Sequence, residues 1–148
     1  MGGGIAQYVF LDTNVLINDF FYRKRQKESG KLAHLAVQFL KSKPKVTLHV
    51  ASFSLVQLIS TLDRSKVTPI EIADEISRIL SRFKLVDLSA KDFTDALKIT
   101  HKDTEDALQY TLCRKVRCFY LVTDNIKDFI DFRLIAPIKP KAVRSMLF

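Results

Sequence analysis

The chain has 148 residues, 47% of them hydrophobic, and 24 Lys and Arg against 16 Asp and Glu give a formal charge of +8. This composition fits one compact domain and excludes a disordered chain, and no apolar stretch approaches the roughly 20 residues that cross a bilayer. The start MGGGIAQ lacks the charged and apolar regions of a secretory signal, so we expect a cytoplasmic protein with no membrane partner.

The first part of the chain reads as one strand followed by helices. Residues 1–6 are interpreted as a flexible leader of a single domain that covers 1–148. QYVFLD, 7–12, is a continuous apolar run typical of a strand buried on both faces of a parallel sheet. Helical spacing follows, with Thr13 as the expected cap of a helix that reaches about Tyr22, and it returns in KLAHLAVQFLKS, 31–42.

The rest of the chain alternates strands and helices. KVTLHVAS, 45–52, is rich in β-branched residues and predicts a strand, and Ser52 or Ser54 is a possible cap for the helix that follows. The remaining expected elements are helices at 54–65, 68–83, 89–100 and 103–115 and strands at 84–88 and 118–123. This order predicts an α/β fold: a three-layer α/β/α sandwich around a mostly parallel sheet of four or five strands.

Acidic side chains gather at one edge of the predicted sheet. Ligands are expected where parallel strands end, and both the first strand and the last strong strand end in acid-bearing turns. The candidate metal ligands come from these turns and from the start of the helix before the last strand: Asp12, Asp124, Asn125, Asp128, Asp103 and Asp106. Carboxylates that converge repel one another, so such a cluster favours a bound Mg²⁺ or Mn²⁺, which can activate water against a phosphate ester.

Each acid also has a structural interpretation. Asp103 stands where a helix cap is expected, and we favour capping over catalysis there. Asp106 shares a helix face with Gln109 and Cys113. The alternative for this face is that it is exposed to water and has no role in a site. Asp124 and Asn125 are ordinary turn residues. Only their predicted convergence favours a site.

Three motifs in order resemble the PIN-domain endoribonucleases: FLDTNVLI, DTEDALQYTLCRK and FYLVTDNIKDF. The resemblance spans nearly the whole chain, and the second and third motifs look most like the VapC-type toxins of type II toxin–antitoxin pairs. It implies a Mg²⁺- or Mn²⁺-dependent ribonuclease that is held in check by a small antitoxin.

The resemblance assigns roles by position. Asp12 matches the first metal aspartate and Asp106 the acid on the late helix, with Thr13, Asn14 and Thr123 as supporting residues. Two positions depart from the pattern, because Gln57 and Asn125 occupy slots that are usually acidic. Asp128, and after it Asp103 or Asp124, is expected to supply the missing charge.

Basic segments are the candidates for RNA phosphate contacts, with solvated helix ends as the alternative. They are Arg23, Lys24, Arg25 and Lys27 in the first segment, Lys41, Lys43 and Lys45 in the second, and Arg114, Lys115 and Arg117 in the third. Tyr22 is open to base stacking or to packing. Apolar positions on 71–83 are read as core, and surplus apolar surface on the early helices would suit a homodimer partner or an antitoxin helix.

Two other functions remain open. One is a PIN-like RNA-binding module whose site has weakened at Gln57 and Asn125. The other is a phosphatase of the haloacid dehalogenase type, which LDTNV approaches, although Asn14 stands where its general acid belongs. The cysteines, Cys113 and Cys118, have no zinc-type spacing and are expected to be reduced thiols.

Overall fold

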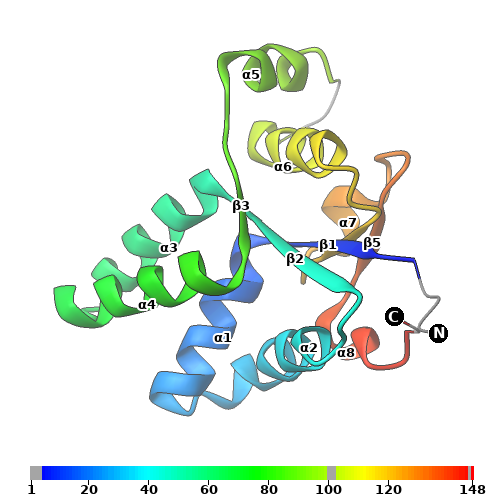
Figure 1. Ribbon diagram of the computed structural model, residues 1–148. Coiled ribbons are helices and arrows are strands. Elements are labelled where there is room, and N and C mark those ends of the chain that lie inside the picture. The colour runs from blue at the N-terminus through cyan, green and yellow to red at the C-terminus, as the bar shows by residue number, and fades with distance from the viewer. Residues whose placement is uncertain (1–4, 100–102, 147) are drawn as a thin grey trace.

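A computed structural model describes residues 5–99, 103–146 and 148 as a parallel sheet between two layers of helices (Figure 1). Residues 1–4 of the expected leader and Thr100 of the expected fifth helix lie outside the described residues. The strands are β1 (Gln7–Leu11), β2 (Val46–Ala51), β3 (Lys84–Val86), β4 (Tyr120–Val122) and β5 (Ala136–Ile138). The helices are α1 (Thr13–Arg25), α2 (Lys31–Lys41), α3 (Ser52–Arg64), α4 (Pro69–Arg82), α5 (Ala90–Leu97), α6 (Thr104–Lys115), α7 (Ile126–Phe129) and α8 (Pro140–Val143), with a 3₁₀ turn at Glu28–Gly30.

The five strands follow the order β3-β2-β1-β4-β5, and every neighbouring pair is parallel. Because all strands run the same way, the ends of β1 and β4 lie at the same edge of the sheet. Phe10 of β1 is in register with Leu121 of β4, which brings the turns that follow both strands together. The three-layer α/β prediction is therefore confirmed, with five strands.

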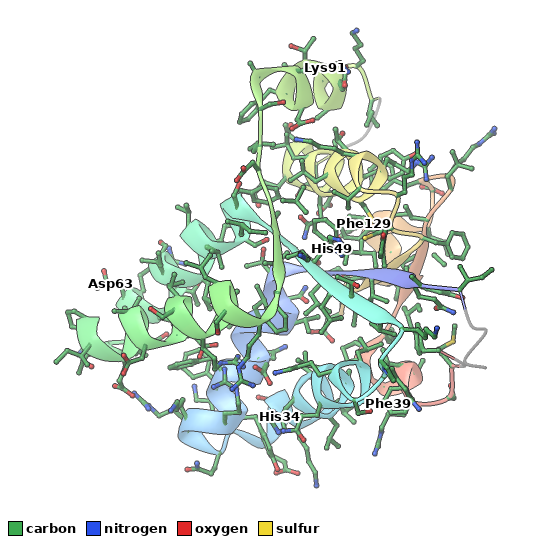
Figure 2. All side chains as sticks on the ribbon, in the orientation of Figure 1. His34, Phe39, His49, Asp63, Lys91 and Phe129 are labelled. Atoms are coloured by element: carbon green, nitrogen blue, oxygen red, sulfur yellow. The ribbon has the colours of Figure 1, made fainter. Side chains whose placement is uncertain are left out.

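Each face of the sheet has its own core, because successive strand residues point to opposite faces. Val9 and Leu11 pack with side chains of α1, α2, α3 and α4. Phe10 faces the other way and packs with α6 and with Phe129 of α7. Figure 2 shows His49 of β2 and Phe129 on this second side, and His34 of α2 on the first.

The helix starts correct two predicted caps. Asp12, not Thr13, is the N-cap of α1, because the Asp12 side chain accepts the Thr13 backbone N–H while Thr13 is already helical. Ala51 precedes α3 in extended conformation, so Ser52 and Ser54 are helical residues rather than caps. The Thr68 cap of α4 is confirmed by its side-chain bond to the Glu71 N–H.

Three elements near the end of the chain, α7, β5 and α8, were not located from sequence. β5 has three residues including Pro137, and it forms the sheet edge, where a missing N–H is tolerated. Its neighbour α7 has a single turn of four residues. Cys113 and Cys118 are buried free thiols, as expected. No helix among the described residues combines the length and the apolar character that crossing a membrane requires.

Candidate functional site

A pocket of about 600 Å³ opens where β1 and the α6–α7 region meet. It lies at the carboxyl end of the sheet, where the parallel topology places ligands. Its lining includes five carboxylates and four amides, together with hydroxyls and one arginine: Asp12, Asp103, Glu105, Asp106, Asp128, Asn14, Gln57, Gln109, Asn125, Thr13, Ser60, Thr61 and Arg64 among others. The structure thus brings together most of the predicted site residues.

Asp12 is held in place through hydrogen bonds to both of its carboxylate oxygens. Its Oδ1 accepts the Thr13 N–H at 2.8 Å and Gln109 Nε2 at 3.1 Å, and its Oδ2 accepts the Thr123 hydroxyl at 2.7 Å. Burial raises the pKa of Asp12 above its ordinary value, and the neighbouring Asp124 charge adds to this, while the three hydrogen bonds act against it. A cation at Asp12 would favour the ionised carboxylate again.

Gln57 of α3 is fully engaged rather than free to bind an ion. Thr13 Oγ1 lies 2.6 Å from Gln57 Oε1 and 2.6 Å from Ser54 Oγ, and a hydroxyl has one proton to give. All three groups are satisfied when Ser54 donates to Thr13 and Thr13 donates to Gln57. The Gln57 amide N–H then donates to Glu105 Oε2 at 2.9 Å. The Gln57 amide therefore holds a carboxylate that comes from α6.

The start of α6 carries three of the pocket acids. Asp103 is its N-cap, and its side chain accepts the Asp106 N–H at 3.2 Å, which supports the capping role that we favoured. The alternative that the helix face of Asp106 simply faces water does not hold for the two residues that share this face further along α6, Gln109 and Cys113. Gln109 is only 2% exposed and bonds to Asp12, and Cys113 is fully buried, because α6 packs between the sheet and α5.

The turn after β4 contributes both support and pocket lining. Thr123 is fully buried and links the two strand ends, since it donates to Asp12 and accepts the Asn125 N–H at 3.0 Å. Asn125 and Asp128 line the pocket. The Asp124 carboxylate instead accepts Asn18 Nδ2 at 3.0 Å and lines a neighbouring depression with Lys139.

The donors in this pocket match a hard divalent cation in type. Among the described residues, no three Asp, Glu, His or Cys side chains lie close enough together to hold an ion by themselves. Mg²⁺ commonly keeps several waters and needs only one or two carboxylates together with phosphate oxygens. In addition, the buried Gln109 Oε1 next to Asp12 has no hydrogen-bond partner. The pocket therefore fits Mg²⁺ or Mn²⁺ bound with water and substrate oxygens.

The first predicted basic segment lies at the far end of α1 from this pocket. The helix rises about 1.5 Å per residue, so Arg23 and Arg25 are roughly 17–20 Å along the axis from Asp12. Arg23 pairs with Asp19 and Glu75 at 3.0 and 2.6 Å, and Arg25 pairs with Glu71. Lys24 and Lys27 are exposed beside them. Tyr22 is half-buried with its ring 5.0 Å from that of His34, which favours packing over base stacking.

The other basic segments also lie outside the pocket. Lys41, Lys43 and Lys45 precede β2, so they stand at the opposite edge of the sheet from the acids. There the structure places Lys41 in one depression with Arg82 and Lys84, two cations that were not singled out from sequence. In the third segment, Lys115 Nζ contacts Asp92 at 2.8 Å and the Asp87 carbonyl oxygen, while Arg114 and Arg117 are exposed.

An apolar groove of about 690 Å³ runs between α3 and α4. It is lined by Val56, Ile59, Ile72, Ala73 and Ile76 among others. The expectation that the apolar face of α4 is core is therefore only partly correct: Ile79 is fully buried, whereas Leu80 is 52% exposed.

Sequence reasoning missed several residues that line or support the site. Glu105 stands beside Asp106 in the quoted motif, and Gln109 lies one turn further on, so helical spacing was the available signal for both. Ser54 and Arg64 carried no comparable signal, because their relation to the acids exists only in the folded chain.

Residues 8–127 match the family profile described as the PIN domain. Comparison with curated protein sequences gives no significant match. Several solved structures share the fold. A VapBC2 complex from Rickettsia felis, bound to a DNA fragment from its promoter, has a TM-score of 0.64 at 18% identity, over 90% of this chain and 98% of that one.

Two further structures are similar to the same degree. VapC20 of Mycobacterium tuberculosis, a toxin that cleaves the sarcin–ricin loop, has a TM-score of 0.65 at 14% identity, over 86% of this chain and 98% of that one. DNA-bound VapBC from Salmonella typhimurium has a TM-score of 0.65 at 18% identity, over 90% and 98%. The profile match and the fold together exclude the haloacid dehalogenase alternative.

Proposed function

Since the chain belongs to the PIN-domain family, we propose that it is a divalent-metal-dependent endoribonuclease. The observation that carries this proposal is the pocket that gathers five carboxylates at the carboxyl edge of the sheet of a chain with net charge +8. The basic surface attracts RNA, and a metal offsets the local repulsion between the acids and a phosphate. VapC20, which has this fold, is a toxin that cleaves the sarcin–ricin loop.

Asp12, Asp106 and Asp128 are the residues that would hold Mg²⁺ or Mn²⁺, with Asn125 as a neutral oxygen donor. When bound, such an ion lowers the pKa of a coordinated water and stabilises charge on the phosphate oxygens. The chain's own residues prepare the site. Thr123 and Gln109 fix the Asp12 carboxylate, and Gln57 holds Glu105 at the pocket wall.

The test is cleavage of a structured RNA with Mg²⁺ or Mn²⁺ by the wild type and by Asp12→Asn and Asp106→Asn variants. We expect metal-dependent cutting that both variants lose by a factor of 100 or more, the scale of a lost catalytic group (~10²–10⁴). Asp74→Asn, which removes an exposed acid of α4 outside the pocket, is the matched control. If the folded wild type binds RNA but leaves it intact with either metal, the chain is instead an RNA-binding module.

We further propose that a small antitoxin covers the apolar groove between α3 and α4, and that the chain forms a homodimer. Two structures of this fold are VapBC complexes. Val56 of the groove and Ile70, which follows the groove residue Pro69, are 67% and 76% exposed, and a partner helix would remove this apolar area from water. Co-expression with the product of a short adjacent reading frame tests this. The wild type should co-purify with that product and Ile76→Glu should not, while light scattering reports the dimer.

A further inference from the structure

The pocket of carboxylates also contains one arginine whose role the metal site does not explain. Arg64 is the last residue of α3, and Ser60, Thr61 and Arg64 all line the pocket. The Arg64 guanidinium donates to Ser60 Oγ at 3.2 Å and lies 3.5 Å from Thr61 Oγ1. These two partners are one turn earlier in the helix, so the side chain folds back along α3 toward the acids.

Within the described part of the chain, Arg64 differs from three other arginines in its lack of an acidic partner. Arg23, Arg25 and Arg78 are each paired with a carboxylate within 3.1 Å. Among the ion pairs of the described residues, none involves Arg64, although five carboxylates line the same pocket. A guanidinium has five N–H donors, and two hydroxyls take up only a part of them.

The position of Arg64 sets which phosphate it can reach. Gln57 and Arg64 are seven residues apart on α3, which corresponds to roughly 10 Å along the axis. Because the Arg64 side chain folds back by about one turn, its charged end remains about 5 Å beyond the level of Gln57. The charged end of Arg64 therefore lies further along α3 than Gln57, in the pocket that also holds the proposed metal ligands.

We propose that Arg64, with the Ser60 and Thr61 hydroxyls, forms a subsite for a non-scissile backbone phosphate of the RNA substrate. The inference rests on the proposed function for the identity of its ligand. A planar guanidinium with free donors is suited to a phosphate, and the hydroxyls complete the polar cradle. The subsite gives the entering strand one attractive contact in a pocket whose other charges repel phosphate, and so fixes the register of the strand relative to Asp12.

The alternative is that Arg64 only stabilises the carboxyl end of α3 through the helix dipole. In that role its loss would change stability without changing RNA binding. Arg144→Ala serves as the matched control, because Arg144 is an exposed arginine that directly follows the last residue of α8, outside the pocket. Both variants remove one positive charge at the end of a helix. Arg64→Lys keeps the charge and removes the planar fork of donors.

The experiment measures binding of a labelled single-stranded RNA by fluorescence anisotropy between 50 and 300 mM salt, in the full chain with Asp12→Asn to prevent cutting. Arg64→Ala should weaken binding roughly tenfold and flatten the slope of log K against log salt by about 0.7, the value for one phosphate contact on a single strand. Arg64→Lys should keep most of the slope, and Arg144→Ala should keep all of it. In the cutting enzyme, Arg64→Ala should raise KM with little change in kcat.

Three results would overturn the proposal. They are an Arg64→Ala slope equal to that of Arg144→Ala, a fall in kcat at unchanged KM, and absence of RNA binding by every variant. The outcome is separable from that of the proposed function. A chain that binds RNA with the Arg64-dependent slope but never cuts it keeps the subsite and loses the nuclease, whereas a cutting enzyme indifferent to Arg64 does the reverse.

Discussion

Gln57→Glu places a carboxylate next to Glu105, and the structure predicts that this substitution destabilises the metal-free chain. Gln57 Nε2 donates to Glu105 Oε2 at 2.9 Å, so the substitution replaces an attraction by two facing carboxylates. Like charges about 4 Å apart repel by about 1 kcal/mol in water and about 4 kcal/mol at the dielectric near a protein surface. Glu105 is exposed, so solvent screening favours the lower figure.

The lost hydrogen bond adds about 1 kcal/mol, so the free energy of unfolding should fall by about 2 kcal/mol. For a chain of this size each kcal/mol corresponds to about 2–4 °C, which gives a Tm lower by about 4–8 °C in EDTA. Mn²⁺ should restore most of the lost stability, because a cation between the two carboxylates attracts both of them. The assay is thermal unfolding followed by circular dichroism, with and without Mn²⁺.

A swap of the two side chains, Gln57→Glu with Glu105→Gln, is the control. It keeps one amide and one carboxylate in contact, so its Tm in EDTA should lie close to that of the wild type. If the single variant melts at the wild-type temperature in EDTA, and Mn²⁺ stabilises it no more than the wild type, then Gln57 does not hold Glu105 in solution and the reasoning fails.

Three further changes test the supports around the pocket and the core. Thr123→Val removes the hydroxyl that donates to Asp12, and should cost about 1–3 kcal/mol in chemical denaturation while Thr123→Ser restores most of it. Arg78→Met leaves the buried Asp19 and Glu75 with Arg23 as their shared arginine and should cost up to about 3–5 kcal/mol in the same denaturation, and an unchanged free energy of unfolding would contradict this role. Burial acts to raise the pKa of Asp92, but hydrogen bonds from Lys115 and Ser89 outweigh it and hold that pKa below its ordinary value. The stabilisation is therefore present above about pH 4 and is lost as the pH falls through the lower folded pKa, and Lys115→Met should reduce this acid-side loss of Tm.

The strands and long helices were predictable because each carries its signal locally. The continuous apolar run of β1 and the Thr68–Pro69 start of α4 depend only on neighbours in sequence. β5 had no such signal, since three residues with a proline become a strand only when β4 offers its edge.

The positions of two acids at the pocket could be predicted from the sequence, whereas the hydrogen bonds between the pocket residues could not. Asp12 and Asp106 follow from strand and helix boundaries, whereas the partners of Gln57 are 44 and 48 residues away in the sequence. Nothing in the sequence near Gln57 distinguishes an amide that binds an ion from one that orients a carboxylate. That choice is made by the Thr13 hydroxyl, which occupies the amide oxygen.

The hydrogen bonds divide the pocket side chains into those that are held in place and those that are exposed to solvent. Asp12 accepts bonds from three residues besides Asn14, and so keeps its place without an ion. Asp128, by contrast, is exposed on the single turn of α7. Ordering an exposed side chain around a cation costs rotamer entropy, and this cost lowers the affinity for the metal. RNA phosphates that share the ion reduce the number of side chains that must be ordered, so metal and RNA should bind with positive cooperativity. Titration of Mn²⁺ by calorimetry with and without uncut RNA measures it, and equal affinities in the two titrations would show that the pocket is already complete for the ion.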